Sequence, residues 1–282
     1  MDLSVIIVSF NVKSYLHQAL HSVITASAGI KSEIIVIDNC SSDGSAEMVE
    51  TLFSGVRLIR SDMNNGYAAA CNMGIRASSG EFILILNPDT IVSPEAFSLS
   101  LKFMNDNPDA GAAGARMTDG SGRFLPESKR GFPSPLTALF RLTGLSFIFR
   151  KSAIVNHYYL GNMPEDTNCR ADILTGAYMF IRRQALEKVG LFDTAFFMYG
   201  EDIDLSHRIV MAGYHNYYLA NVRITHFKGM SSGNNNPVCI RYFYEAMIIF
   251  SRKYFSGSLL FIILPAIKAR MYLALFSAQF RK

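Results

Sequence analysis

The stretch FILILNPDT, residues 82–90, decides the fold class of this 282-residue chain. Its five consecutive apolar residues predict a strand that is buried on both faces, and Asn87-Pro88-Asp89 predicts a turn at the carboxyl end of that strand. Two upstream segments have the same form, LSVIIVSF at residues 3–10 and EIIVID at residues 33–38. Strands that are apolar on both faces are typical of a parallel sheet covered by helices.

Helical patterns alternate with these strands. Apolar residues between Val12 and Ile24 recur at spacings of three and four, which places them on one face of a helix. The alanine-rich segment from Gly66 to Ala77 predicts another helix, and residues 56–59 predict a short strand. We therefore expect an α/β fold with a Rossmann-like, mostly parallel sheet and helices on both faces. Ligands of such sheets bind at the carboxyl ends of the strands.

The second half of the chain is less regular. The pattern loosens after Ala115 and returns near Asp172. Residues 178–181 and 217–226 predict strands, and residues 184–189 and 203–211 predict helices. Because no linker is visible, we expect one catalytic domain over residues 1–235 and a carboxyl-terminal segment over residues 236–282.

Composition excludes several classes of protein. Half of the residues are hydrophobic and 18% are charged, which argues against disorder. The first residues lead directly into a strand, so a secretory signal is not expected. Four widely spaced cysteines predict reduced thiols rather than a zinc site or a disulfide framework. No Walker loop is present, and Gly66 to Gly74 does not form the dinucleotide fingerprint of dehydrogenases.

Positive charge is concentrated in two segments. Residues 116–151 contain seven basic and two acidic residues, and residues 240–282 contain seven basic residues and Glu245 alone. Both segments carry bulky apolar side chains, which favours an anionic bilayer surface over nucleic acid. The apolar run 259–267 is shorter than the ~20 residues that span a bilayer. It is either a helix packed on the protein's own core or an in-plane membrane attachment, and the nearby charges favour the latter.

Several acids and one histidine are candidate site residues. Asp38, at a strand end, either caps the next loop or accepts hydrogen bonds from a nucleotide's base or ribose. Asp89 either forms an Asx turn or binds Mg²⁺ or Mn²⁺ against a substrate pyrophosphate. Glu201 and Asp202 either complement a helix dipole or supply a base whose pKa is raised by aromatic surroundings. His226 is either structural or a metal ligand.

Six ordered blocks of sequence resemble the inverting family-2 glycosyltransferases. The blocks are VSFN at 8–11, IDNCSSDGS at 37–45, NNGYAAACNMGI at 64–75, LNPDT at 86–90, TGAYMFIRR at 175–183 and YGEDIDL at 199–205. They lie in a stretch that runs from about residue 3 to residue 230. The Asn-Pro-Asp-Thr form is most similar to bacterial rhamnosyltransferases of cell-surface polysaccharide assembly.

The resemblance implies a GT-A fold with a nucleotide-sugar half over residues 1–115 and an acceptor half over residues 116–235. The basic and apolar composition of residues 236–282 predicts amphipathic, membrane-associating helices there. The resemblance further implies that Asp202 is the general base, that Glu201 orients the acceptor or the base, and that Asp89 and His226 bind the metal. The implied donor-binding residues are Ser9, Asn11, Asp38, Asn65, Gly66, Asn72 and Asn87. Gly66 would permit a close approach of the backbone.

The resemblance also implies the partners. The donor would be a nucleotide diphosphate sugar, with dTDP-rhamnose the best guess, and the acceptor a saccharide or a polyprenyl-linked saccharide. The cofactor would be Mg²⁺ or Mn²⁺, and nucleic acid is not expected. We expect a cytoplasmic location, peripheral on the inner face of the cell membrane.

Two features depart from the family pattern. Asn87 stands at the first position of the family's Asp-x-Asp motif, and its amide brings no negative charge to a metal. The chain has no tryptophan, so sugar stacking would use Tyr178, Phe197 or Tyr199. Asn87 keeps open a non-catalytic sugar or lipid-carrier binding module. A sugar nucleotidyltransferase would need a glycine-rich basic loop after the first strand, and residues 9–13 (SFNVK) do not form one.

Overall fold

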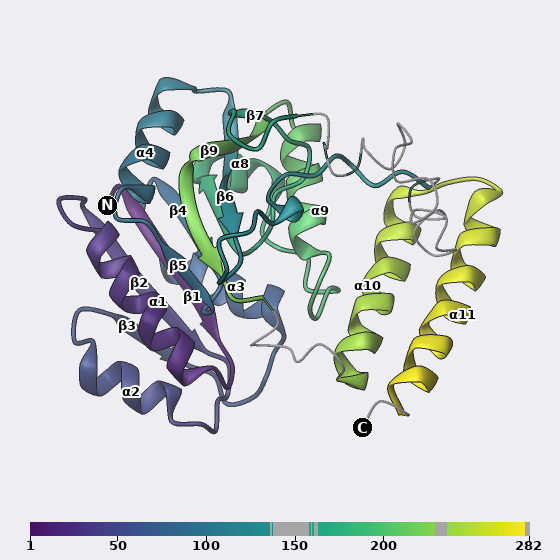
Figure 1. Ribbon diagram of the computed structural model, residues 1–282, viewed down its shortest axis with the longest axis horizontal. Coiled ribbons are helices and arrows are strands. Elements are labelled where there is room, and N and C mark those ends of the chain that lie inside the picture. Colours follow the sequence, from purple (N-terminus) through teal and green to yellow (C-terminus); the bar gives the residue numbers. More distant parts are fainter. Residues whose placement is uncertain (136, 138–157, 159, 161–162, 229–235, 280–282) are drawn as a thin grey trace.

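The structure of the chain is a computed structural model that describes residues 1–135, 137, 158, 160, 163–228 and 236–279 (Figure 1). Its amino-terminal part alternates strands and helices as predicted: β1 (Leu3–Ser9), α1 (Lys13–Ala26), β2 (Ser32–Asp38), α2 (Ser45–Leu52), β3 (Arg57–Arg60), α3 (Tyr67–Ala77) and β4 (Phe82–Leu86). Every residue of β1 and β4 is buried, which explains why neither strand contains a charged residue.

The second half of the fold adds five strands and three α-helices among the described residues. Its elements are β5 (Thr90–Val92), α4 (Ala96–Asp106), β6 (Ala110–Thr118), the 3₁₀ turn η1 (Pro126–Ser128), β7 (Cys169–Arg170), β8 (Tyr178–Arg182), α8 (Arg183–Val189), α9 (Glu201–Met211) and β9 (His215–His226). Most of the irregular segment from residue 117 to residue 159 lies outside the described residues.

One sheet joins all nine strands. Its order is β3-β2-β1-β4-β8-β6-β9-β5, with β7 beside β9. Strands β1 to β4 are parallel, and β6 is parallel to β9, whereas β8 runs antiparallel to β4 and β6. The α/β prediction is confirmed. Strands β1 to β4, β6 and β9 run in one direction, and β5, β7 and β8 run against them.

Two hydrophobic cores cover the two faces of the sheet. Val5 and Ile7 of β1 belong to the core that includes Leu16 of α1, and Ile6 belongs to the core that includes Cys71 of α3. Successive side chains of a strand point to opposite faces, so β1 contributes to both cores. The carboxyl ends of β1, β2 and β4 therefore lie at one edge of a rigid, fully buried layer.

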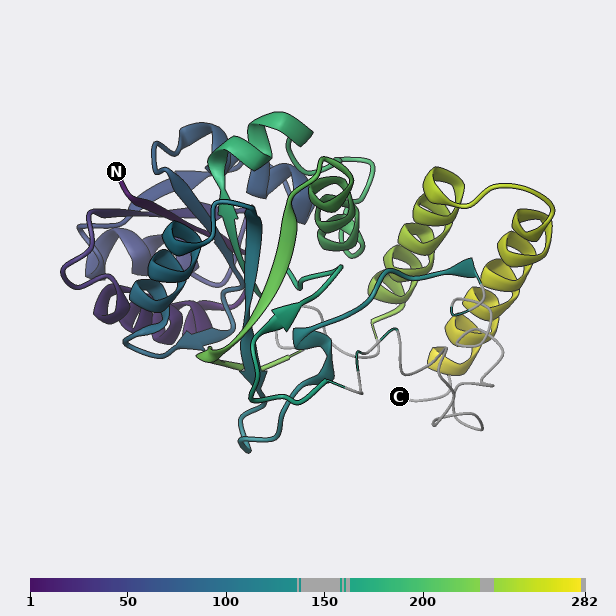
Figure 2. The same cartoon turned by 90° about the horizontal axis from the view of Figure 1, so that it is seen from above.

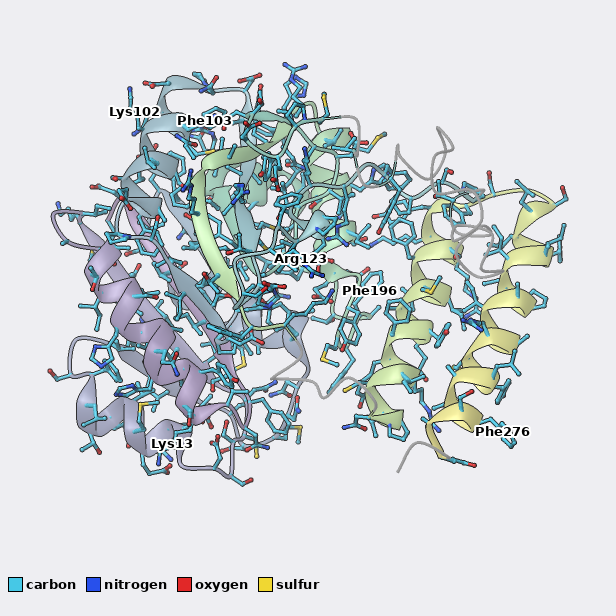
Figure 3. The ribbon with its side chains drawn as sticks, in the orientation of Figure 1. Lys13, Lys102, Phe103, Arg123, Phe196 and Phe276 are labelled. Carbon is cyan, nitrogen blue, oxygen red and sulfur yellow. The ribbon has the colours of Figure 1, made fainter. Side chains whose placement is uncertain are left out.

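Two further helices, α10 (Pro237–Tyr254) and α11 (Leu259–Gln279), stand beside the sheet on one side of the molecule (Figure 2). A third apolar cluster joins them to the loop of residues 193–200 through Phe196, Phe250 and Ile263. Phe196 lies between the sheet-bearing part and α10 (Figure 3).

Helix α11 corrects two predictions. It spans 21 residues and so continues well past the apolar run 259–267, and among the described residues it is the one helix with the length and composition to cross a membrane. Lys268 and Arg270 do not end it, because lysine and arginine are good helix formers. It is also not amphipathic: Ile263 and Ile267 are buried on one face, while apolar residues such as Phe261 are exposed on the other.

Candidate active site

The ends of β1 and β2 place Ser9 beside Asp38. The two residues are paired in register, and both are buried. One carboxylate oxygen of Asp38 accepts a hydrogen bond from the backbone N–H of Ser41 at 3.0 Å. The other oxygen, Oδ1, and the hydroxyl of Ser9 have no hydrogen-bond partner among the residues that the structure describes. Buried polar atoms without partners are costly, so this pair is suited to a polar ligand.

Two predicted donor-binding asparagines order the neighbouring loops. Asn11 has a left-handed backbone (φ 54°), and its side-chain oxygen accepts from the backbone N–H of Ser42 at 2.8 Å. The amide of Asn65 donates to the hydroxyl of Ser61 at 2.6 Å. Both residues lie near Asp38 in the fold, and their side chains hold the loops that follow β2 and β3.

Gly66 permits a close approach between two parts of the chain, the start of α3 and the loop of residues 193–200. Its φ is 81°, and a Cβ atom at this position would lie 2.5 Å from the carbonyl oxygen of Phe197. The next residue, Tyr67, donates its backbone N–H to that same oxygen at 2.7 Å. The start of α3 therefore rests on the loop 193–200, and the glycine is required by this contact.

Asn72 has a structural environment. It is buried within α3, donates to the carbonyl of Phe192 at 2.8 Å and accepts from the N–H of Phe192 at 3.0 Å. Both ends of its amide thus bind one residue of the segment that leads to α9. Asn72 fixes that segment to α3 and does not reach the surface where a donor would lie.

Asn87, Asp89 and His226 meet where the turn between β4 and β5 lies against the carboxyl end of β9. His226 Nε2 lies 3.3 Å from Asp89 Oδ1 and 3.4 Å from Asn87 Nδ2. The backbone fixes this arrangement, because Thr90 pairs with His226 and the carbonyl of Asp89 accepts from the N–H of Phe227. A buried carboxylate, an imidazole and an amide are thereby brought to one point.

The donor atoms at this point fit a divalent cation that is shared with a substrate. In the described part of the chain, no three His, Cys, Asp or Glu side chains are grouped to hold a metal. Asp89 and His226 supply one oxygen and one nitrogen, and Asn87 can add only an uncharged oxygen. Mg²⁺ and Mn²⁺ commonly complete such partial sites with phosphate oxygens and water.

The acidic pair begins α9 after a strained turn. Tyr199 and Gly200 both have positive φ, 72° and 82°. Glu201 is buried, and its Oε2 has no hydrogen-bond partner among the described residues. Burial, reinforced by the neighbouring charge of Asp202, raises the pKa of Glu201 to about 8. The sequence predicted a raised pKa within this acidic pair, and the residue whose pKa is raised is Glu201.

Asp202 is held by charge and by backbone groups. Its Oδ2 forms an ion pair with Arg130 Nη2 at 2.9 Å and accepts from the N–H of Gly176 at 3.3 Å. Its Oδ1 accepts from the N–H of Ile203 at 2.8 Å. These contacts hold the carboxylate in a fixed orientation at the amino-terminal end of α9.

Sequence reasoning missed Arg130 and Tyr67 as site residues. Arg130 Nη2 also donates to the carbonyl of Leu174 at 3.0 Å, and although burial alone lowers its pKa, the charge of Asp202 raises it overall. The hydroxyl of Tyr67 donates to Asn87 Oδ1 at 2.9 Å, and burial raises the pKa of Tyr67. Tyr67 stands in one of the resemblance blocks, whereas nothing in the irregular segment around Arg130 indicated its partner.

The proposed stacking aromatics differ in their surroundings. Tyr178 is fully buried, and its hydroxyl lies 2.9 Å from that of Ser100 in the core. It is therefore excluded as a sugar platform. Phe197 is partly buried, and its ring stacks on Tyr242 of α10, with ring centroids 4.5 Å apart.

Solved structures with the same fold define the class of protein. The mannosyltransferase PcManGT from Pyrobaculum calidifontis, in complex with GDP-Man and Mn²⁺, superposes with a TM-score of 0.62 at 18% identity, covering 99% of this chain and 75% of its own. A Staphylococcus aureus TarS 1-349 structure with UDP-GlcNAc gives 0.59 at 19% identity, covering 97% and 73%. The fold is thus that of GT-A glycosyltransferases, as predicted.

The sequence places the chain more narrowly. Residues 4–190 match the family described as "Glycosyl transferase family 2", and the chain belongs to that family. It is 27% identical over 266 residues to the N-acetylglucosaminyl-diphospho-decaprenol L-rhamnosyltransferase of Mycobacterium tuberculosis, covering 90% of this chain and 85% of that protein. The protein is therefore a glycosyltransferase.

Proposed function

We propose that this glycosyltransferase transfers rhamnose from dTDP-rhamnose to a hydroxyl of a lipid-linked saccharide during cell-surface polysaccharide synthesis, with inversion at the anomeric carbon. The observation that carries the proposal is the meeting of Asn87, Asp89 and His226 at one sheet edge. The similarity to the mycobacterial L-rhamnosyltransferase over most of both chains supports the choice of sugar and of acceptor.

Each site residue has a task in this proposal. Asp38 and Ser9, which each have one buried oxygen without a hydrogen-bond partner among the described residues, would bind the base or ribose of the donor. Asp89 and His226, with Asn87, would hold Mg²⁺ or Mn²⁺. When bound, that cation neutralises the diphosphate leaving group. The manganese in the related mannosyltransferase complex supports this requirement.

The acceptor is activated from the other side of the sugar. Asp202 would take the proton of the acceptor hydroxyl while the acceptor oxygen bonds to the anomeric carbon and the bond to the donor's phosphate oxygen breaks. Arg130 holds Asp202 in place before the reaction. Glu201, with its raised pKa, is protonated at neutral pH and could donate a hydrogen bond that orients the acceptor or the base. One displacement of this kind inverts the anomeric configuration.

Helix α11 supports peripheral attachment to the inner face of the cell membrane. Its length suits a span, but Lys268 and Arg270 lie near its middle, and each charge costs ~2.5–3.5 kcal/mol at the centre of a bilayer. An in-plane helix places neither charge at the centre of the bilayer, and it buries exposed apolar side chains such as Phe261 at the membrane surface. The lipid-linked acceptor would then lie in the same plane.

A donor-binding panel tests the proposal. Thermal stability of the purified chain is measured with dTDP-, UDP- and GDP-sugars, each with Mn²⁺, Mg²⁺ or EDTA. We expect stabilisation by dTDP-rhamnose that depends on the metal and disappears in Asp89→Asn. Stabilisation by a different nucleotide would refute the donor assignment. Retained anomeric configuration in the product, measured by NMR, would refute inversion.

The proton-transfer role of Asp202 has its own test. Asp202→Asn keeps the shape of the side chain and removes its basicity, so we expect turnover to fall by at least a hundredfold. Donor binding by thermal shift should stay nearly unchanged. If donor binding falls as much as turnover, Asp202 is a structural helix-start residue instead.

Asn87 favours one second candidate, a non-catalytic sugar-binding module. Its amide brings no charge to the metal, and both of its ends lie near Tyr67 and His226. Such a module would bind a nucleotide sugar without consuming it. Incubation of the chain with dTDP-rhamnose, Mn²⁺ and a polyprenyl-diphosphate saccharide separates the two, because only the enzyme releases dTDP.

A further inference from the structure

We propose that α10 is part of the transferase site: Tyr242 and Lys253 are positioning residues that clamp the loop 193–200 against α3 and so set the placement of Tyr67 and Asp202. The proposal rests on the proposed function of Asp202 and of the Asn87–Asp89 edge. It assigns the carboxyl-terminal helices a role in the site besides membrane attachment.

The first contact of the clamp runs from α10 to the metal edge. Tyr242 stacks on Phe197 with ring centroids 4.5 Å apart and planes inclined by 27°. The carbonyl of Phe197 accepts from the backbone N–H of Tyr67, and the hydroxyl of Tyr67 reaches Asn87 at 2.9 Å. A movement of the Tyr242 ring would therefore displace Phe197, and Phe197 would displace Tyr67, the residue that binds Asn87.

The second contact fixes both sides of the acidic pair. Lys253 Nζ lies 2.6 Å from Asp193 Oδ2 and 2.6 Å from Asp204 Oδ1. Asp193 begins the loop, and Asp204 lies in the first turn of α9, two residues after Asp202. Asp204 is fully buried and also binds Arg208 at 2.8 Å. Charge-assisted hydrogen bonds of this kind are strong, so Lys253 ties the beginning and the end of the segment to one point.

The surface between the two contacts is closely packed. Positions 242, 246, 249 and 253 recur every three or four residues, so they share one face of α10. A Cβ atom on Gly200 would lie 3.4 Å from the Cβ of Ala246. Between the loop and α10 lies a small cavity of about 30 Å³, lined by Phe197, Tyr242 and Ala246 among others. Close-packed surfaces transmit displacement, so the loop cannot shift independently of α10.

Tyr242 and Lys253 act through other residues. Their contacts are with Phe197, Asp193, Asp204 and Tyr254. A displacement of about 1 Å at a reacting group can lower a rate by about a hundredfold. We therefore expect their removal to lower turnover by tenfold to a hundredfold while the chain stays folded.

The test compares alanine variants with conservative ones in the full-length chain. Tyr242→Ala removes the stacked ring and Tyr242→Phe keeps it; Lys253→Ala removes the charge and Lys253→Arg keeps it. The matched controls are Val238→Ala and Arg252→Ala, at exposed positions of the same helix. The first readout is amide hydrogen exchange of Tyr67 and of residues 201–205 in the free protein, and it does not depend on the donor.

We expect both alanine variants to exchange at least tenfold faster in these segments, with the conservative and control variants within twofold of the wild type. Turnover of dTDP-rhamnose with Mn²⁺ and a polyprenyl-diphosphate saccharide should follow the same order, with kcat falling more than the KM of the acceptor changes. If Tyr242→Ala fails to fold, Tyr242→Leu replaces it.

Unchanged exchange in the alanine variants overturns the clamp, whatever the donor is. If the alanine variants exchange faster but turn over the donor at the wild-type rate, the positioning role is also overturned. Faster exchange together with an inactive wild-type chain supports the clamp and instead contradicts the assigned substrates.

Discussion

The two adjacent acids at the start of α9 have different environments and therefore different properties. Glu201 is buried and its Oε2 lacks a partner in the described part of the structure, whereas Asp202 binds Arg130 and two backbone N–H groups. Neighbouring carboxyl groups with divergent environments are a common basis for assigning acid and base roles. The pair thus combines a Glu201 that retains its proton with an Asp202 whose carboxyl group is held by Arg130.

The pKa of Glu201 predicts a pH-dependent stability. Between the ordinary value of 4.5 and the raised value of about 8, the folded chain retains a proton that the unfolded chain loses. The free energy of unfolding should therefore fall by about 1.4 kcal/mol per pH unit across this range, and level off above it. Urea denaturation at several pH values measures the slope.

Glu201→Gln should remove that slope, because glutamine carries no titrating proton. Glu187→Gln, at an exposed position of α8, is the matched control and should keep it. If the wild type and Glu201→Gln show parallel pH profiles, the carboxyl group does not keep its proton in the folded chain.

Asn87 predicts an effect on metal binding. Asn87→Asp adds a second carboxylate beside Asp89, and affinity for hard cations rises with the number of charged oxygen ligands. We expect the Kd for Mn²⁺, measured by calorimetry in the presence of dTDP, to fall by about tenfold. Asn105→Asp is the control, at an exposed position of α4. Equal Mn²⁺ affinity in the wild type and Asn87→Asp would place Asn87 outside the metal site.

At the scale of elements, sequence pattern predicted the strands that are buried on both faces. β1, β2 and β4 each contain a continuous apolar run, and the boundaries of these strands agree with the predictions to within one residue. β6 was missed because its sequence, AGAAGARMT, is rich in alanine and glycine and poor in the β-branched and aromatic residues typical of strands. Small residues are needed there, since a Cβ on Gly111 would lie 2.5 Å from Ile209.

The same reasoning explains which part of the site could be predicted. Asp38 and Asp89 were found because strand ends are recognisable in the sequence and parallel strands end at one edge. The pair of Arg130 and Asp202 joins residues 72 positions apart through an irregular segment, and no local pattern encodes such a contact. Resemblance supplied Asp202 as the base but not its partner.

The contact between α3 and the loop 193–200 predicts a large cost for Gly66→Ala. Gly190 provides the matched control: its φ is 82°, close to the 81° of Gly66, but no atom lies within 4 Å of its missing Cβ. Gly190→Ala should lower the free energy of unfolding by about 1 kcal/mol from backbone strain alone. Gly66→Ala adds the clash with Phe197, a further ~1–3 kcal/mol. Equal losses in urea denaturation would mean that the contact with Phe197 relaxes freely.

At the scale of the whole molecule, α11 presents an apolar face away from α10. Phe261, Tyr272 and Phe276 are 83%, 66% and 61% exposed, and their spacings place them on one side of the helix. Burying three aromatic side chains in a bilayer surface contributes several kcal/mol at roughly 25 cal/mol per Å². This face is the strongest candidate for the membrane contact of the proposed function.

Serine substitutions test that contact. The triple variant Phe261→Ser, Tyr272→Ser and Phe276→Ser should lose at least tenfold in co-sedimentation with vesicles that contain anionic phosphatidylglycerol. The control Leu52→Ser with Met211→Ser removes exposed apolar side chains from α2 and α9 and should bind as the wild type does. Equal binding of the triple variant would contradict attachment through α11.

The stacked rings of Phe197 and Tyr242 also have a practical consequence. The chain contains no tryptophan, so Tyr242→Trp would introduce a single indole, which absorbs and emits at longer wavelengths than the remaining tyrosines. The indole would lie against Phe197, in the loop that contacts Tyr67. The helix that carries the substitution, α10, is not part of the sheet. The emission of the indole would change when the loop shifts, so substrate binding at the buried sheet edge could be followed in real time by stopped-flow fluorescence without any label on the substrate.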